Sequence, residues 1–259
     1  MASFFLALGG AALAADPGYL GQDLAGWWRM DEAGGLVADD SSGLGNDGAL
    51  VGDVSFTDDA LVGRALDFTD VSGEILVAHD PSLEPVTGTV EAWVKVSTPQ
   101  NSDILVSLTD LLVRTGTPCG CGVIGLQIQA DGSARGFVAN NDPTTPLAPW
   151  READSPPGLL TPHRWHHLAL RWDGSDVAIF VDGILRQATP YDPVPGLGLS
   201  YNDGTGPYLG LGTTWAIPGP HEFIGQLDDV RLYGRPLPDR EIFSTWASRG
   251  HRPARPPGR

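Results

Sequence analysis

Hydrophobic and polar residues alternate along several short runs of the chain, and residues 88–96 show the pattern most clearly. Valine or alanine occupies every second position from 90 to 96, and the positions between them hold Glu91, Trp93 and Lys95. Side chains at successive positions of an extended chain point to opposite faces, so a period of two residues indicates a β-strand. The pattern predicts one apolar face and one mixed face.

Asp-Gly pairs mark places where a strand is expected to reverse. Asp173-Gly174 and Asp182-Gly183 each follow one apolar run and precede another. This dipeptide supplies the positive φ angles that tight hairpins require. We therefore expect antiparallel strands at residues 165–172, 176–181 and 184–188. A similar hairpin is expected at Asp131-Gly132, between residues 125–129 and 134–139.

A helical period appears near the C-terminal end, at residues 238–248. Pro238 and Asp239 suit a first turn, and Ile242, Phe243 and Trp246 fall on one helical face. The chain of 259 residues also contains 34 glycines and 22 prolines, which favours many short strands and turns. Together these features predict an all-β fold with one short helix.

The organisation we expect is a single domain at residues 23–248 with short flanking segments. Residues 1–15 form an apolar run ending in Ala12-Leu13-Ala14, which suits signal-peptidase cleavage and is too short to span a bilayer. The run lacks the usual preceding positive residue, so a misplaced start codon or a disordered terminus also fits. Residues 16–22 are a linker, and residues 249–259, rich in Arg and Pro, form an expected disordered tail or a docking tail for an acidic partner.

The formal charge of −16 narrows the range of partners. Such a field repels phosphate backbones and anionic lipid, so we expect no nucleic-acid partner and no membrane insertion. It attracts cations such as calcium, although acidity can also serve solubility alone. Cys119 and Cys121 are the only cysteines. They could close a small disulfide in an oxidising compartment, but two ligands are too few for a zinc site.

Four stretches of sequence carry a family resemblance when they are taken in order. They are residues 26–34 with 40–48, residues 65–68 with 91–94, residues 165–174 with 180–183, and residues 223–233 with 235–237. This order resembles the laminin G-like, concanavalin A-like jelly-roll family from about Asp23 to Trp246. The resemblance implies two antiparallel sheets packed face to face, with the first and last strands adjacent. We expect residues 24–30 to pair with residues 223–233, each covering the other's open edge.

The same pairing suggests a calcium site, which many members of the family hold near these positions. Calcium prefers six to eight oxygen ligands. Our candidates are Asp31, Asp40, Asn46 and Asp228, with backbone carbonyls of the loop at residues 40–48. The alternative is that Asp40 and Asn46, with nearby serines, only cap turns through hydrogen bonds to the backbone.

Catalytic motifs are absent from the sequence. His166 and His167 are neighbours on a strand and should point to opposite faces. The jelly-roll glycoside hydrolases carry a Glu-x-Asp-x-x-Glu run, which this chain lacks, and no Gly-x-Ser-x-Gly elbow is present. We therefore expect a protein that is not an enzyme.

Two long loops, at residues 140–162 and 190–207, are the expected binding region. The ligand-stacking candidates are Trp150, Tyr191, Tyr201 and Trp215, although such aromatics can also pin a loop to the sandwich. We predict a secreted, non-catalytic module that binds carbohydrate or an extracellular protein surface, with structural calcium. The alternatives are a structural or adhesive component of the cell envelope and a jelly-roll glycoside hydrolase.

Overall fold

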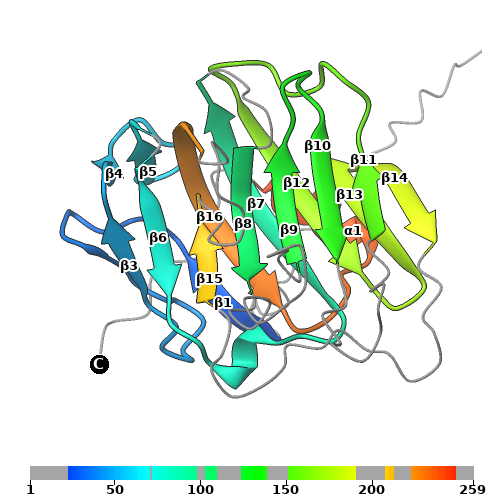
Figure 1. Cartoon of the computed structure of the whole chain (residues 1–259), viewed down its shortest axis with the longest axis horizontal. Coiled ribbons are helices and arrows are strands. Elements are labelled where there is room, and N and C mark those ends of the chain that lie inside the picture. Colours follow the sequence, from blue (N-terminus) through cyan, green and yellow to red (C-terminus); the bar gives the residue numbers. More distant parts are fainter. Residues whose placement is uncertain are drawn as a thin grey trace, which may run out of the picture.

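Two antiparallel sheets pack face to face in the computed structural model of the chain (Figure 1). The structure describes residues 23–70, 72–97, 103–109, 124–138, 151–190, 208–212 and 223–248. Sheet A has the strand order β14 (Ile184–Pro190), β13 (Asp176–Val181), β12 (Trp165–Trp172), β7 (Gly88–Val96), β16 (Gly225–Tyr233), β5 (Ala65–Phe68) and β4 (Val54–Thr57), and β1 (Leu24–Trp28) also pairs with β16.

Sheet B has the strand order β11 (Arg151–Asp154), β10 (Ala134–Val138), β9 (Ile124–Ile128), β8 (Asp103–Thr109), β15 (Tyr208–Leu211), β6 (Glu74–Val77), β3 (Gly48–Val51) and β2 (Val37–Ala38). A short 3₁₀ turn, η1, spans Pro81–Leu83, and the helix α1 spans Asp239–Ala247. The predicted all-β sandwich with one C-terminal helix is confirmed. No helix within the described ranges is long and apolar enough to cross a membrane.

The Asp-Gly hairpins form where the sequence predicts them. β12, β13 and β14 are consecutive antiparallel neighbours, and so are β9 and β10. Gly174, Gly183 and Gly132 all have positive φ angles in these turns, and Asp182 does as well. The strand ends differ from prediction by one or two residues because edge pairing, which sequence does not reveal, sets where each ladder stops.

The main hydrophobic core lies between the sheets. Val90, Ala92, Val94 and Val96 of β7 all belong to it, as the period of two predicts. The opposite face of β7 is buried as well, with Glu91 1% exposed and Trp93 2% exposed. Sheet A is therefore covered on both faces.

A second apolar cluster covers the outer face of sheet A. Ile242 of α1 packs there with Leu237, Tyr233 and Phe180. Phe243, predicted to share the buried face of the helix, is 48% exposed and instead contacts the ring of Trp246 at a centroid distance of 5.3 Å. The buried face of this short helix is formed by Glu241, Ile242 and Thr245, so Phe243 falls outside it.

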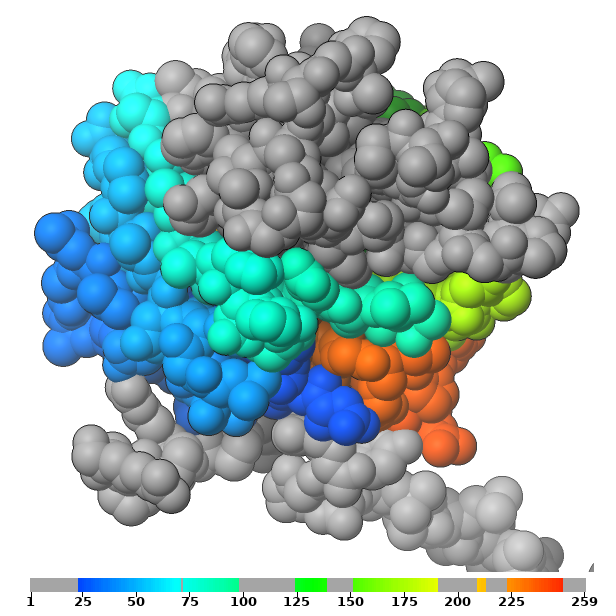
Figure 2. Space-filling view, turned by 60° about the horizontal axis from the view of Figure 1, so that its bottom comes forward, coloured from blue at the N-terminus to red at the C-terminus, as the bar shows by residue number. Residues whose placement is uncertain are grey.

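The first and last strands pair as expected. Leu24 lies opposite Tyr233 and Trp28 opposite Val230. Figure 2 shows the blue N-terminal and orange C-terminal segments side by side on the surface. The expectation that the two strands close an open edge is wrong, because β16 lies inside the sheet between β7 and β5. β16 is long enough for β5 to pair with its first residues and β1 with its last.

Candidate functional site

The Asp40 carboxylate organises the loop that we predicted to hold calcium. Its Oδ1 atom accepts hydrogen bonds from the backbone N–H groups of Trp27 at 2.9 Å and Ser42 at 2.8 Å. Its Oδ2 atom accepts from the Ser42 hydroxyl at 2.6 Å and from the Asn46 N–H at 3.0 Å. Both oxygens are thus already used by N–H and O–H donors, which is the arrangement of a turn cap.

Asn46 connects this loop to two other elements. Its Nδ2 group donates to the Ala25 carbonyl at 2.7 Å and to the Ser82 hydroxyl at 2.9 Å. Its backbone carbonyl accepts a hydrogen bond from the Trp28 indole at 2.7 Å. Asn46 therefore links the loop to β1 and to η1, and its buried amide serves the packing of the loop.

The other two predicted ligands have different neighbours. Asp31 Oδ2 lies 3.2 Å from Arg29 Nε, and Asp31 Oδ1 accepts a hydrogen bond from the Arg64 N–H at 3.2 Å. Asp228 is fully buried on β16, opposite Trp93. The structure thus brings Asp40 and Asn46 into contact.

These donor sets fit hydrogen-bonded turns better than an ion's coordination shell. Among the residues that the structure describes, no group of three or more His, Cys, Asp or Glu side chains has the arrangement of a metal site. Calcium binding by Asp31, Asp40, Asn46 and Asp228 stays a prediction.

The four aromatic ligand-binding candidates, Trp150, Tyr191, Tyr201 and Trp215, lie outside the described residues. The strand ends that flank them are described. At one end of sheet B, Tyr208 lies opposite Thr109, and Ile124 lies opposite both Leu108 and Val138. Val138 in turn lies opposite Arg151. We call this row, made of Thr109, Ile124, Val138, Arg151 and Tyr208, the loop end of sheet B.

The chain leaves or enters sheet B at this row several times. The connections at residues 110–123 and 139–150 both begin and end there, and the connection at residues 191–207 ends there at Tyr208. The connection at residues 213–222 starts beyond Leu211, at the other end of β15. The loop end is therefore the place where the anchors of three long connections converge.

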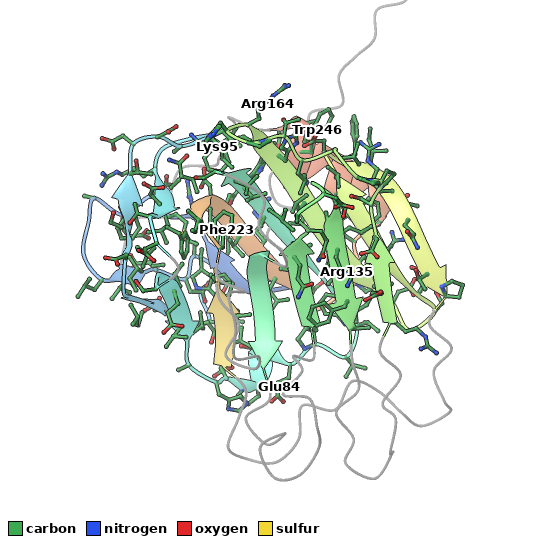
Figure 3. The ribbon with its side chains drawn as sticks, turned by 45° about the horizontal axis from the view of Figure 1, so that its top comes forward. Glu84, Lys95, Arg135, Arg164, Phe223 and Trp246 are labelled. Atoms are coloured by element: carbon green, nitrogen blue, oxygen red, sulfur yellow. The ribbon has the colours of Figure 1, made fainter. Side chains whose placement is uncertain are left out.

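A polar cluster lies on the outward side of β10 and β11. Arg135 forms a bidentate pair with Asp154, from Nε to Oδ1 at 2.7 Å and from Nη2 to Oδ2 at 3.0 Å. Glu152 lies 3.4 Å from Arg135 Nη1. The hydrogen bonds with Asp154 raise the pKa of Arg135. All three side chains are about one third exposed, with Arg135 at 31%, so this face offers both charged donors and acceptors to a polar ligand. Figure 3 labels Arg135 on the green strands of sheet B.

The histidines that invited a catalytic interpretation make separate contacts. His166 Nδ1 lies 3.0 Å from Asp182 Oδ2, and His166 Nε2 accepts a hydrogen bond from the Thr161 N–H at 3.2 Å. His167 packs its ring against Trp93 at a centroid distance of 5.1 Å. The two imidazole rings therefore contact different side chains, although Asp182 Oδ1 also accepts a hydrogen bond from the His167 backbone N–H at 3.0 Å.

Comparisons with known proteins agree with the fold. Residues 70–243 match the laminin G-like family model described as the concanavalin A-like lectin/glucanases superfamily. Mouse (Mus musculus) usherin is 29% identical over 91 residues, which is 35% of this chain and 2% of that protein. The chain therefore spans a very small part of that relative.

Solved structures with a similar fold come from several kinds of protein. Domain 4 of AbnA, an extracellular arabinanase of Geobacillus stearothermophilus solved in complex with arabinotriose, has a TM-score of 0.62 and 18% identity, with 85% of this chain and 97% of that chain covered. The binding domain of Paraclostridial Mosquitocidal Protein 1 has a TM-score of 0.64 and 13% identity, with 88% and 53% covered.

A third similar structure, Trypanosoma rangeli sialidase in complex with sialic acid, has a TM-score of 0.58 and 19% identity, with 87% of this chain and 33% of that chain covered. At these identities the likenesses establish the fold. The family model, in contrast, matches more than half of the chain. Together with the two-sheet sandwich, this match shows that the chain belongs to the laminin G-like family of the concanavalin A-like lectin/glucanases superfamily.

Proposed function

We propose that the chain is a secreted, non-catalytic recognition module that binds carbohydrate at the loop end of sheet B. The observation that carries the proposal is the convergence of three connections on one row of strand ends. Those connections contain Trp150, Tyr191 and Tyr201, whose rings can stack on sugar faces. Loops anchored on a rigid sandwich are common places for binding.

The similarity to the AbnA domain supports a glycan ligand. That domain was solved with arabinotriose, and nearly its whole length is covered by this chain. Arg135, Glu152 and Asp154, which lie on the outward side of β10 and β11, would supply hydrogen bonds to the hydroxyls of a sugar chain that extends along these strands. The sialidases were solved as whole enzymes of which this chain covers about a third. This chain lacks the acidic run of the jelly-roll hydrolases, so the proposal includes no catalytic step.

The test is calorimetric titration of the protein with arabinotriose and a panel of other oligosaccharides, followed by the variants Trp150→Ala and Tyr201→Ala. Loss of one stacking ring should weaken affinity about tenfold, which corresponds to about 1.4 kcal/mol. Trp215→Ala is the matched control, because its connection leaves the opposite end of β15. Equal effects of all three substitutions, or no sugar binding by the parent protein, would contradict the proposal.

Recognition of a protein surface is the second candidate. It is favoured by the similarity to binding domains of toxins, including a receptor-binding domain of a botulinum neurotoxin with a TM-score of 0.61. If the ligand is a protein, the calorimetric titrations with oligosaccharides should show no binding. Immobilised protein would then retain an extracellular protein partner, and Trp150→Ala would reduce that retention.

A further inference from the structure

Several of the sequence stretches that carry the family resemblance meet on the outer face of sheet A, under α1. Glu91 comes from β7, His167 from β12, and Asp229, Arg231 and Tyr233 from β16. We call these residues the Glu91 cluster. Each is buried, with Glu91 1% and His167 0% exposed. The proposed glycan site, at the loop end of sheet B, uses none of them.

The positive charge of the cluster is already neutralised by Asp229. Arg231 Nη2 lies 2.8 Å from Asp229 Oδ2, and the Trp27 indole donates to Asp229 Oδ1 at 2.6 Å. The guanidinium of Arg231 also lies over the Trp27 ring, 5.0 Å from its centroid. Glu91 therefore adds a second carboxyl to a buried place that has one guanidinium, and ionising it would leave a surplus negative charge.

The polar atoms around Glu91 are close together without direct hydrogen bonds. Glu91 Oε1 lies 3.6 Å from His167 Nε2, which is too long for a hydrogen bond. Within the described part of the chain, both carboxyl oxygens of Glu91, both ring nitrogens of His167, the Tyr233 hydroxyl, and Nε and Nη1 of Arg231 have no partner at hydrogen-bond geometry, although the Tyr233 hydroxyl lies near enough to Glu91 and to Arg231 to interact with both. Leaving such a buried group unsatisfied costs about 1–3 kcal/mol. Folded proteins usually satisfy such groups with ordered internal water.

We propose that internal water joins Glu91, as a neutral acid, to His167 and Tyr233, and that ionisation of Glu91 loosens α1 from sheet A. Burial raises the pKa of Glu91 to about 8 and lowers the pKa of His167 to about 3, so both groups are neutral at pH 7. Burial also raises the pKa of the Tyr233 hydroxyl. The cluster is thus a set of neutral donors and acceptors beside one ion pair, in which Arg231 uses Nη2 for Asp229 and leaves Nε and Nη1 for internal water.

Ionised Glu91 would face the negative charge of Asp229 on β16. The buried carboxylate of α1, Glu241, is 4% exposed and is paired with Arg235, with its Oε2 atom 2.7 Å from Arg235 Nη2. Thr245 of α1 lies beside the Glu91 carboxyl but without hydrogen-bond geometry. The negative charge of Asp182, in the turn between β13 and β14, interacts with His167. Arg231 attracts Glu91 but is shared with Asp229. Moving α1 outward is the simplest way to admit water to the new charge.

The attachment of α1 predicts which part would move. Its N-terminal end is held by contacts that do not involve Glu91, because Leu237 N–H donates to Thr89 Oγ1 at 2.8 Å and Arg171 Nη1 lies 2.6 Å from Asp239 Oδ1. Thr245, near the C-terminal end of the helix, is the part that faces Glu91. Loosening should therefore begin at the C-terminal end.

Hydrogen–deuterium exchange of residues 239–247, corrected for intrinsic exchange rates, tests the proposal at pH 6 and pH 9. Protection of the helix should fall roughly a hundredfold across this range in the parent protein. Glu91→Gln keeps the size and the neutral character of the acid, so it should abolish the dependence on pH. Glu241→Gln removes a different buried carboxyl and should leave the dependence in place. Equal protection at both pH values in the parent protein, or the same loss in Glu91→Gln, overturns the proposal.

Two measurements on the parent protein keep the proposal testable if a variant does not fold. Carbon-13 NMR of labelled glutamate carboxyls should find one carboxyl that remains protonated at pH 7, and complete ionisation there would overturn the neutral acid. A high-resolution crystal structure near pH 6 should show ordered water between Glu91 and His167. A direct Glu91–His167 hydrogen bond with no water would overturn the hydration.

Discussion

Asp40 illustrates how a single carboxylate can determine the path of a loop. Its two oxygens accept hydrogen bonds from three backbone N–H groups and one hydroxyl, spread over β1 and the loop between β2 and β3. Short polar side chains suit this role because they reach nearby backbone groups without leaving the turn. The same oxygens would have to exchange these donors for an ion if the loop bound calcium.

Replacing Asp40 by alanine should lower the free energy of unfolding by about 1–3 kcal/mol, because several backbone donors lose their acceptor. Urea denaturation measures the change. Asp58→Ala is the control, since that side chain is 88% exposed and pairs only at the surface with Arg64. Its effect should stay within about 0.5 kcal/mol.

The same denaturation experiment, repeated with EDTA and with calcium, separates the two interpretations of the loop. A turn cap predicts that the effect of Asp40→Ala is equal in both conditions. A calcium site predicts that calcium stabilises the parent protein and that Asp40→Ala removes this stabilisation. The second outcome would restore the predicted site at Asp31, Asp40, Asn46 and Asp228.

Strands and turns with local signals could be predicted from the sequence. The Asp-Gly hairpins, the period of two in β7 and the short helix all follow from neighbouring residues. The burial of Glu91 could not be predicted, because α1 and β1 cover that face and lie far away in the sequence. A period of two reveals two faces but does not reveal what packs on the second one.

Gly183, in the hairpin between β13 and β14, also touches α1, so it tests how two elements depend on each other. Its φ is 72°, and an added Cβ would lie 3.1 Å from Trp246 side-chain atoms. Gly183→Ala should therefore strain both the hairpin and the docking of the helix. Gly174→Ala is the matched control, because its φ is 87° but nothing lies within 4 Å.

Both alanine variants should lose about 1 kcal/mol to the positive φ angle. Gly183→Ala should lose about 1–2 kcal/mol more from the contact with Trp246. Thermal or urea denaturation gives the difference. Equal destabilisation of the two variants would mean that Trp246 moves aside without cost.

At the scale of the whole molecule, Glu91 and His167 make the free energy of unfolding depend on pH. It should be nearly constant over a middle range of pH and should fall at higher and at lower pH. The pKa of Glu91 is raised from 4.5 to about 8, so its stabilising contribution is complete below pH 4.5 and is lost as the pH rises toward 8. The pKa of His167 is lowered from 6.5 to about 3, so its contribution is complete above pH 6.5 and is lost as the pH falls toward 3. Between pH 4.5 and 6.5 the two slopes have opposite signs and cancel.

We expect the free energy of unfolding contributed by this pair to be nearly flat between pH 4.5 and 6.5. From pH 6.5 to 8 it should fall by about 1.4 kcal/mol per pH unit through Glu91 alone. Urea denaturation at a series of pH values measures the profile, and the difference between the parent protein and Glu91→Gln isolates the Glu91 contribution. A difference that is constant from pH 6.5 to 8 would contradict the assignment.

The candidate sites were harder to predict than the fold. The resemblance placed the first and last strands side by side, and the pairing of β1 with β16 confirms it. The resemblance did not predict that Arg29 contacts Asp31, because the sequence does not determine the conformation of the Arg29 side chain. The position of β16 between β7 and β5 in sheet A was also not predicted, because both neighbouring strands come from distant parts of the chain.

The pairing of β1 with β16 brings the start and the end of the sandwich to one point. Leu24 lies opposite Tyr233, and the Gly234 N–H donates to the Asp23 carbonyl at 2.8 Å. Because α1 follows β16, tension applied to the polypeptide on both sides would first load the contacts that hold α1 on sheet A, and would then load these hydrogen bonds one after another once α1 has detached. Mechanical unfolding should therefore begin with α1 and proceed from the Leu24–Tyr233 end of the β1–β16 ladder.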